Sequence, residues 1–206
     1  MPAQIIADAS DRAIAEWIAR RIAAALAAPP DDAVTITVPG GSTPFPILAE
    51  LARHDLDWSR VTIWPGDDRV VPDNHPASNV GRIREAMGRT GAHIPALHEG
   101  AHPPHFALTW LGMGGDGHIA SLFPNTDPRA DDPALLRAIT PDPLPPEAPF
   151  SRLTLTIPAL ANTDAVLFVI RGKDKRDLFD AALSGAHDLP VARFLKACAA
   201  PVTCFT

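Results

Sequence analysis

The sequence lacks the hallmarks of a membrane or secreted protein. It contains no run of about 18 apolar residues, the length that would span a bilayer. Its first residues, Met1 to Asp11, lack a basic segment followed by an apolar core, so no secretory signal is indicated. We therefore expect a cytoplasmic protein with no membrane partner.

Cysteine and lysine are also scarce. The two cysteines, Cys198 and Cys204, have no Cys-x-x-Cys spacing and no neighbouring histidine, which argues against a metal site or a disulfide framework. The net charge is −6 and no basic block occurs, which disfavours a nucleic-acid partner. Lysine occurs only at positions 173, 175 and 196. An anionic ligand would therefore have to be attracted by a few local groups.

The order of apolar segments indicates one α/β domain. At 206 residues and 46% hydrophobic, the chain can bury one core, and we expect a single domain over residues 1–206. Strand and helix patterns alternate with short loops, which is typical of a three-layer domain with a mainly parallel sheet. The expected strands are residues 4–7, 33–38, 61–64, 106–111, 152–157, 165–170 and 202–205, and the expected helices are residues 9–28, 74–88 and 189–196, with two more around 47–51 and 178–183.

A glycine-rich segment follows the expected strand at 106–111. It runs from Gly112 to His118 and contains four glycines, Asp116 and His118. Glycine lets backbone N–H groups approach a ligand, and Asp116 and His118 can project into one crevice at the carboxyl end of the strand. The alternative is a turn in which Asp116 caps a helix, opened by the apolar residues that follow, and the histidine is incidental.

Two other strand ends carry groups suited to an anion. The strand at 33–38 runs into Gly40-Gly41-Ser42-Thr43, whose N–H groups and hydroxyls converge at a helix start. Capping of that helix by Ser42 or Thr43 is the alternative, and it is compatible with anion binding. The segment has neither the spacing nor the lysine of a Walker loop. Lys175 lies at another helix start, where anionic groups are preferred, and a bound anion would explain it.

A third strand end is charged. Asp67, Asp68 and Arg69 follow the strand at 61–64 and would face the same crevice, with a solvated loop as the alternative. Farther along, residues 125–149 contain seven prolines and are expected to form an irregular covering segment.

Four histidines lie close together among proline and glycine. Their spacing does not place two of them on one helical face beside a carboxylate, as a metal site on a helix would require. We therefore expect a mobile surface loop without a metal. The four are His93, His98, His102 and His105.

Four segments, in order along the chain, resemble the 6-phosphogluconolactonase family. They are GGSTP from Gly40, DDRVVP from Asp67 with Ser78-Asn79 downstream, LGMGGDGHIASLFP from Leu111, and RLTLTIPAL from Arg152 followed by Gly-x-x-Lys ending at Lys175. The resemblance implies a Rossmann-like α/β/α sandwich, shared with glucosamine-6-phosphate deaminases and ribose-5-phosphate isomerases. It also implies hydrolysis of 6-phospho-D-glucono-1,5-lactone to 6-phosphogluconate, in the oxidative branch of the pentose phosphate pathway.

The resemblance further implies roles for individual residues. His118, oriented by Asp116, would be the general base, and Lys175 and Arg69 would contact the sugar phosphate. Arg69 would also assist catalysis. The other implied substrate contacts are Gly40, Gly41, Ser42, Thr43, Asp67, Asp68 and Gly114. No cofactor or metal is expected, and the expected partner is the small-molecule lactone, bound by a monomer or weak homodimer.

The chain departs from the family pattern in three ways. Asp68 stands where the family has glutamate, residues 92–105 are too short for the family's amphipathic helix, and the chain ends at Thr206, earlier than usual. Because that helix would lie beside the site, its absence could narrow or open the pocket, change the oligomer contacts or abolish the activity.

Lactone hydrolysis needs a positioned water, a base and stabilisation of the oxyanion. His118 would take the proton of the water and return it to the ring oxygen, while N–H groups of Gly112 to Gly115, or Arg69, would face the oxyanion. An acyl-enzyme on Ser121 is a weaker option, because no Gly-x-Ser-x-Gly elbow is present. Two rivals remain. One is an isomerase or deaminase, disfavoured because Phe123 stands where deaminases have glutamate, and the other is a catalytically silent sugar-phosphate-binding protein.

Overall fold

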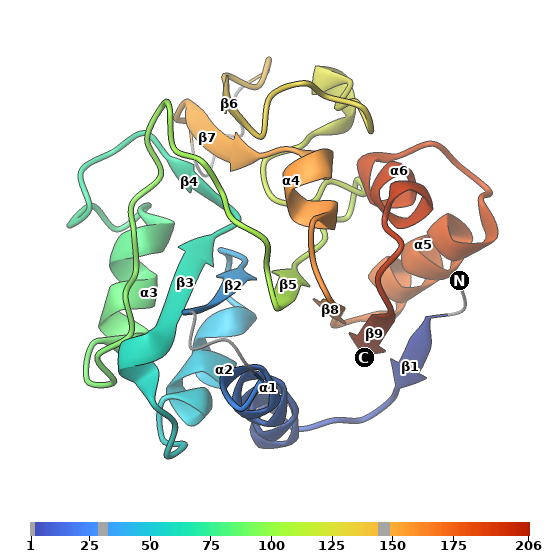
Figure 1. Cartoon of the computed structure of the whole chain (residues 1–206). Helices are drawn as coiled ribbons and strands as arrows, with labels where there is room; N and C mark the ends of the chain where they lie inside the picture. Colours follow the sequence, from blue (N-terminus) through green and yellow to red (C-terminus); the bar gives the residue numbers. More distant parts are fainter. Residues whose placement is uncertain (1–2, 29–32, 144–148) are drawn as a thin grey trace.

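Helices cover both faces of a central sheet in the computed structural model, which describes residues 3–28, 33–143 and 149–206 (Figure 1). The sheet has the strand order β1-β9-β8-β5-β2-β3, and each neighbouring pair is parallel. The predicted three-layer α/β/α sandwich with a mainly parallel sheet is thus confirmed. The strands are β1 Gln4–Ile6, β2 Val34–Val38, β3 Val61–Pro65, β5 Leu108–Leu111, β8 Val166–Val169 and β9 Val202–Phe205.

The helices divide between the two faces of the sheet. In α1, the Ser10 hydroxyl caps the N-terminus by accepting the N–H of Ala13 at 3.2 Å, and Ile14, Ile18 and Ile22 form a buried stripe. One face is covered by α1 Asp11–Leu26, α2 Pro44–Leu51 and α3 Asn79–Met87. The other face is covered by α4 Ile157–Ala161, α5 Lys173–Ser184 and α6 Pro190–Ala197. Two short 3₁₀ turns are η1 Trp58–Arg60 and η2 Pro124–Thr126.

A second, antiparallel sheet lies at the top of Figure 1, in the order β4-β7-β6. Its strands are β4 Asp67–Arg69, β7 Arg152–Leu155 and β6 Leu136–Ile139. Residues 67–69, placed in a strand-end segment with a solvated loop as the alternative, therefore form a strand, and the expectation of an irregular segment over 125–149 is wrong at β6. Three charged residues carry no strand periodicity, and β4 is held as a strand by its partner β7, far away in the sequence.

The apolar residues after His118 also differ from expectation, because they open no helix. Ile119 and Leu122 form an isolated antiparallel bridge, and Ala120 between them has a left-handed φ of 48°. A left-handed residue at this point interrupts helical geometry. The chain turns instead, and the turn buries the side chain of Ser121.

The segment at 92–105 packs against the edge of the main sheet. The N–H of Ile63 donates to the carbonyl of His93 at 2.8 Å, and the N–H of His93 donates to the carbonyl of Val61 at 2.9 Å. Ile94 is buried, and its carbonyl accepts two N–H groups of the Arg84 guanidinium. His93 and Ile94 are thus anchored to β3 and α3, so the expected mobile surface loop does not include these two residues. They also protect an otherwise open strand edge.

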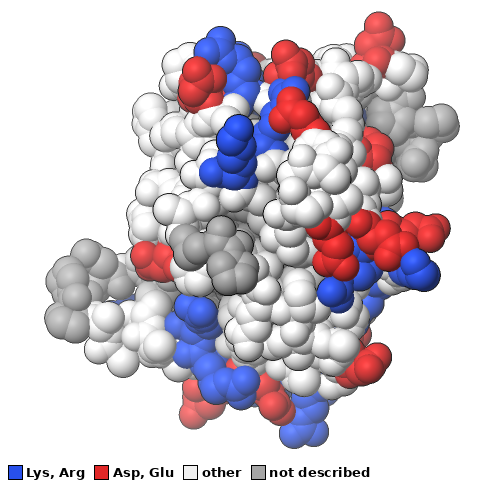
Figure 2. Space-filling view, turned by 90° about the vertical axis from the view of Figure 1, so that its right-hand side faces the viewer, with Lys and Arg blue, Asp and Glu red and all other residues white. Residues whose placement is uncertain are grey.

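The surface has no broad field of one charge on the side that carries α5 and α6, where acidic and basic side chains are interspersed (Figure 2). Among the described residues, no helix is both long enough and apolar enough to cross a bilayer.

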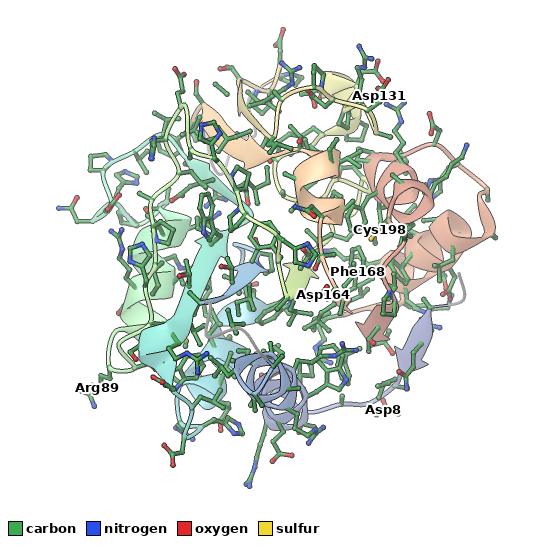
Figure 3. All side chains as sticks on the ribbon, viewed as in Figure 1. Asp8, Arg89, Asp131, Asp164, Phe168 and Cys198 are labelled. Atoms are coloured by element: carbon green, nitrogen blue, oxygen red, sulfur yellow. The ribbon has the colours of Figure 1, made fainter. Side chains whose placement is uncertain are left out.

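The core consists of one apolar cluster on each face of the main sheet. Phe168 of β8, labelled in Figure 3, is fully buried beneath α5 and α6. Its ring centroid lies 4.9 Å from that of Phe179 and 6.2 Å from that of Phe194, at the offset and edge-on distances that aromatic pairs prefer. This packing fixes β8 and α5 relative to each other, and so fixes the loop that joins them.

Candidate functional site

The loops that follow β2, β5 and β8, together with β4, surround one cavity of about 320 Å³. Ligands usually bind at this edge of a parallel sheet, and a volume of that size suits a small metabolite. Among the residues proposed from the sequence, the cavity is lined by Gly40, Gly41, Ser42, Thr43, Asp67, Arg69, Gly114, His118 and Lys175. Asp116 and Asp68 do not line it.

Asp116 lies behind His118 and holds its imidazole. The carboxylate Oδ1 is 2.6 Å from Nδ1 of His118 and also accepts the backbone N–H of His118 at 3.2 Å. Burial opposes ionisation of Asp116, but the charge and hydrogen bonds of His118 outweigh it and hold the pKa of the carboxyl below its usual value. Because a carboxylate can only accept, Nδ1 must carry a hydrogen, and in the neutral ring Nε2 is left as a proton acceptor.

The glycines of this loop allow the pair to form. A β-carbon on Gly114 would collide with the imidazole of His118 and with the carboxylate of Asp116, so the close approach requires glycine. On its other side, the imidazole packs against Phe123, with ring centroids 4.7 Å apart. The ring is therefore held by a carboxylate at one end and an apolar wall on one face.

The three residues of β4 have different roles, because side chains alternate between the two faces of a strand. Asp67 and Arg69 line the cavity, whereas Asp68 points to α3, since successive strand residues face opposite ways. The two carboxylate oxygens of Asp68 accept the N–H groups of Asn79 at 2.6 Å and Val80 at 2.9 Å. Asp68 therefore serves as an anionic partner for a helix N-terminus, and the structure does not bring this predicted substrate contact to the cavity.

Burial raises the pKa of the Asp68 carboxyl, with a smaller contribution from the nearby charge of Asp67, although three backbone N–H groups oppose the shift. Asp68, where the family resemblance leads us to expect glutamate, thus holds the N-terminus of α3 through its bonds to Asn79 and Val80.

Asn79 joins the two cavity-lining residues of β4. Its Oδ1 accepts NH1 of Arg69 at 3.2 Å, and its Nδ2 donates to the carbonyl of Asp67 at 2.8 Å. Its side chain also lies so close to Gly40 that a β-carbon there would collide with it. Asn79 is 1% exposed and itself lines the cavity. Sequence reasoning used Asn79 only as part of a motif and missed this position between β4, α3 and the Gly40 turn.

The hydroxyl of Ser121 is hydrogen-bonded to Asp67. It donates to Oδ2 of Asp67 at 2.5 Å, and the residue is 1% exposed. It does not line the cavity, so the geometry does not support an acyl-enzyme at this residue.

Neither hydroxyl of the Gly41-Ser42-Thr43 turn caps α2. Thr43 precedes the helix without a side-chain bond to it, and no hydrogen bond of the Ser42 hydroxyl occurs within the described residues. Both hydroxyls therefore remain available to a ligand. The capping alternative for this turn is not observed.

Three cations line the cavity, against the single carboxylate of Asp67. They are Arg69, Arg171 and Lys175. In the parts of the chain that the structure describes, the Lys175 ammonium has no hydrogen-bond or carboxylate partner, whereas Lys173 is paired with Asp177 and Arg176 with Asp180. The lining of the cavity therefore has more cationic than anionic side chains, although the protein is acidic.

The histidines of the 92–105 segment do not assemble a metal site. No group of three or more His, Cys, Asp or Glu side chains suited to a metal occurs within the described ranges. His105 is instead turned toward Asn162 and Asp164, before β8 and away from the cavity.

The chain matches the family described as glucosamine-6-phosphate isomerases/6-phosphogluconolactonase over residues 7–103 and 85–203. It belongs to this family. It is 36% identical to a 6-phosphogluconolactonase of Pseudomonas aeruginosa, over 90% of this chain and 87% of that protein, and 32% identical to one of Mesorhizobium japonicum, over 94% and 89%.

Solved structures of family members have the same fold. A 6-phosphogluconolactonase from Shewanella baltica superposes with a TM-score of 0.83 at 25% identity, covering 99% of this chain and 97% of that one. A monomeric glucosamine-6-phosphate deaminase has a TM-score of 0.75 at 16% identity, covering 98% and 96%, which shows the shared fold alone. Because nearly the whole of the Shewanella chain is covered, the short 92–105 segment does not mark the loss of a large part of the fold.

Proposed function

We propose that this protein hydrolyses 6-phospho-D-glucono-1,5-lactone to 6-phosphogluconate, the lactone-opening step of the pentose phosphate pathway. Curated relatives named 6-phosphogluconolactonase, at up to 36% identity over most of the chain, support it. The observation that carries the proposal is the His118–Asp116 pair at the edge of a small cavity lined by three cations. A base and a local positive charge are what hydrolysis of an anionic lactone requires.

In the proposed mechanism, Nε2 of His118 takes a proton from water as the water attacks the lactone carbonyl. Asp116 keeps the reactive nitrogen unprotonated in the resting ring and stabilises the imidazolium that forms. The protonated His118 then gives its proton to the ring oxygen as the carbonyl–oxygen bond breaks. Arg69, or N–H groups of Gly112 to Gly115, stabilise the negative oxygen of the tetrahedral intermediate.

The phosphate would occupy the end of the cavity formed by Lys175 and the Gly41–Thr43 turn. Lys175 supports this assignment because it is the cavity-lining cation without a partner in the described chain. Attraction must be local, since the net charge is −6 and salt screens exposed charges beyond about 10 Å.

The two rival functions make different demands on the site. A deaminase would need an acid–base group where Phe123 packs against His118, and a phenyl ring has no transferable proton. A silent sugar-phosphate-binding protein would use the cations without the base. The ordered His118–Asp116 pair favours the enzyme.

We also propose that the protein is cytoplasmic, acts as a monomer or weak homodimer and binds no nucleic acid. The net charge of −6 supports the last point, because nucleic acid would be repelled.

Proton release after addition of freshly prepared 6-phosphoglucono-1,5-lactone tests the proposed activity. We expect release well above the spontaneous rate, and a much slower reaction with unphosphorylated gluconolactone. A rate equal to spontaneous hydrolysis, combined with saturable binding of 6-phosphogluconate, would instead support the silent binding protein.

A further inference from the structure

Arg171 is a cavity-lining cation to which the preceding sections assign no function. It follows Ile170, the residue after β8, and precedes Gly172, the N-cap of α5, so it lies in the loop that leads into the first turn of α5, where Lys175 is found. Both side chains line the cavity. The packing of β8 against α5 through Phe168 and Phe179 fixes this loop.

The guanidinium of Arg171 is held in place by the start of α1. Its NH1 and NH2 each lie 3.2 Å from the carbonyl oxygen of Ala9, and NH2 also donates to Oδ1 of Asp11 at 3.1 Å. A guanidinium has five N–H donors, and these bonds use three of them. Two donors therefore remain for a ligand in the cavity.

We infer that Arg171 is a second cation of the phosphate subsite, acting with Lys175, and that Ala9 and Asp11 position its guanidinium. The inference rests on the proposed function and deepens it by naming a further residue that recognises the phosphate. A phosphate group presents three oxygens, and an N–H of Arg171 that Ala9 and Asp11 leave free can donate a charge-assisted hydrogen bond to one of them. Lys175 would then contact another oxygen.

Lys173, two residues away in the same segment, gives a matched comparison. It carries the same charge, but it does not line the cavity and its ammonium is paired with Asp177 one helical turn along α5. Its side chain is 82% exposed, against 39% for Arg171. Removing the charge of Lys173 therefore has the same long-range electrostatic effect on ligand binding as removing the charge of Arg171. It does so without removing a side chain that lines the cavity.

The test compares Arg171→Met, Arg171→Lys and Lys173→Met with the native protein. For each, KM is measured with the phosphorylated and the unphosphorylated lactone, and binding of 6-phosphogluconate and gluconate is measured by calorimetry. We expect Arg171→Met to weaken the two phosphorylated ligands about 10-fold, the lower end of the range for a charged hydrogen bond. Arg171→Lys should recover part of that loss of affinity. Lys173→Met should change the affinity for the phosphorylated ligands by less than about twofold.

Two results would overturn the inference. One is equal weakening of phosphorylated and unphosphorylated ligands in Arg171→Met, which would indicate that Arg171 only ties β8 to α1 and supports the fold. The other is unchanged binding of 6-phosphogluconate in a folded Arg171→Met variant. The calorimetric measurement of 6-phosphogluconate binding does not require catalytic turnover. Native protein that binds 6-phosphogluconate without hydrolysing the lactone would therefore contradict the proposed function, and the role of Arg171 would still be decided.

Discussion

The imidazole of His118 is oriented by contacts that each have a separate physical basis. Asp116 accepts from Nδ1, Phe123 packs on the ring, and Gly114 leaves room for both. The carboxylate fixes which nitrogen is protonated, and packing limits rotation of the ring. A general base must be held in this way, because proton transfer needs a hydrogen-bond distance to the reacting water.

Replacement of His118 by asparagine should lower kcat for the phosphorylated lactone by about 10²- to 10⁴-fold, with KM nearly unchanged, because only the transition state loses its proton acceptor. Steady-state kinetics measure both constants. The control is His98→Asn, at an exposed position outside the cavity, which should behave as the native protein. A near-native kcat in His118→Asn would remove His118 from the role of base.

Replacement of Lys175 by alanine should raise KM for the phosphorylated lactone by about 10- to 150-fold, the range expected for one charged hydrogen bond, with a smaller change in kcat. The unphosphorylated lactone should be a poor substrate and should barely be affected. If Lys175→Ala weakens both substrates equally, Lys175 does not recognise the phosphate.

At the scale of elements, the site depends on the junction of β4, α3 and the Gly40 turn. Asp68 holds the N-terminus of α3, and that placement brings Asn79 between Arg69 and Asp67. Two charged groups of the cavity, Asp67 and Arg69, therefore come from a strand of the small sheet that is hydrogen-bonded to a helix packed on the main sheet.

Replacement of Asn79 by leucine should lower stability by about 1–3 kcal/mol, because it leaves buried hydrogen-bonding groups unpaired. It should also raise KM, since Arg69 loses one of the two acceptors that orient it. Chemical denaturation and kinetics measure the two effects. Asn74→Leu, at an exposed position between the end of β4 and the start of α3, is the control and should change neither. An unaltered KM in a destabilised Asn79→Leu would show that its role is structural only.

A second junction lies at the amino ends of the strands. Nδ1 of His105 is 2.9 Å from Oδ1 of Asn162, and Nε2 is 2.8 Å from Oδ1 of Asp164. The hydrogen bond with Asn162 raises the pKa of His105, burial opposes the shift, and Asp164 adds to it. Protonated His105 can donate to both oxygens at once.

Because the folded pKa of His105 lies above its unfolded value of about 6.5, the stabilisation is fully present below that pH and is lost as pH rises through the folded pKa. His105→Gln should therefore lower the melting temperature more at pH 6 than at pH 9. Melting curves across this range provide the measurement. An equal difference at both pH values would contradict a contribution from the charged histidine.

At the scale of the whole molecule, an acidic protein must bind an anionic substrate through a few local donors. Three cations at the carboxyl edge of the sheet supply this charge, and the described residues contain no cluster suited to a metal. The proposed chemistry uses a histidine and water, so it does not depend on a Lewis acid.

Prolonged dialysis against a chelator should therefore leave both kcat and the melting temperature unchanged. Activity before and after dialysis, and after addition of zinc, measures the effect. Loss of activity that zinc restores would overturn the metal-free mechanism. The matched control is the same dialysis without chelator.

The sequence by itself determined the strands of the main sheet, their parallel arrangement, most of the helices and many of the polar cavity-lining residues. It did so because buried strands are continuous apolar runs, and because the carboxyl ends of parallel strands meet at one edge. Gly40 to Thr43, Asp67, Arg69, His118 and Lys175 each lie in the segment that comes after such a strand, so a local pattern was enough to find them.

Only the tertiary structure decided which way these side chains point and what holds them. β4 exists because it pairs with β7, and its alternation sends Asp67 into the cavity and Asp68 to α3. Ser121 is directed to Asp67 by a left-handed turn at Ala120. Arg171 is directed by Ala9 and Asp11, about 160 positions away in the sequence. Such contacts join residues far apart along the chain, and no local pattern of residue types encodes them.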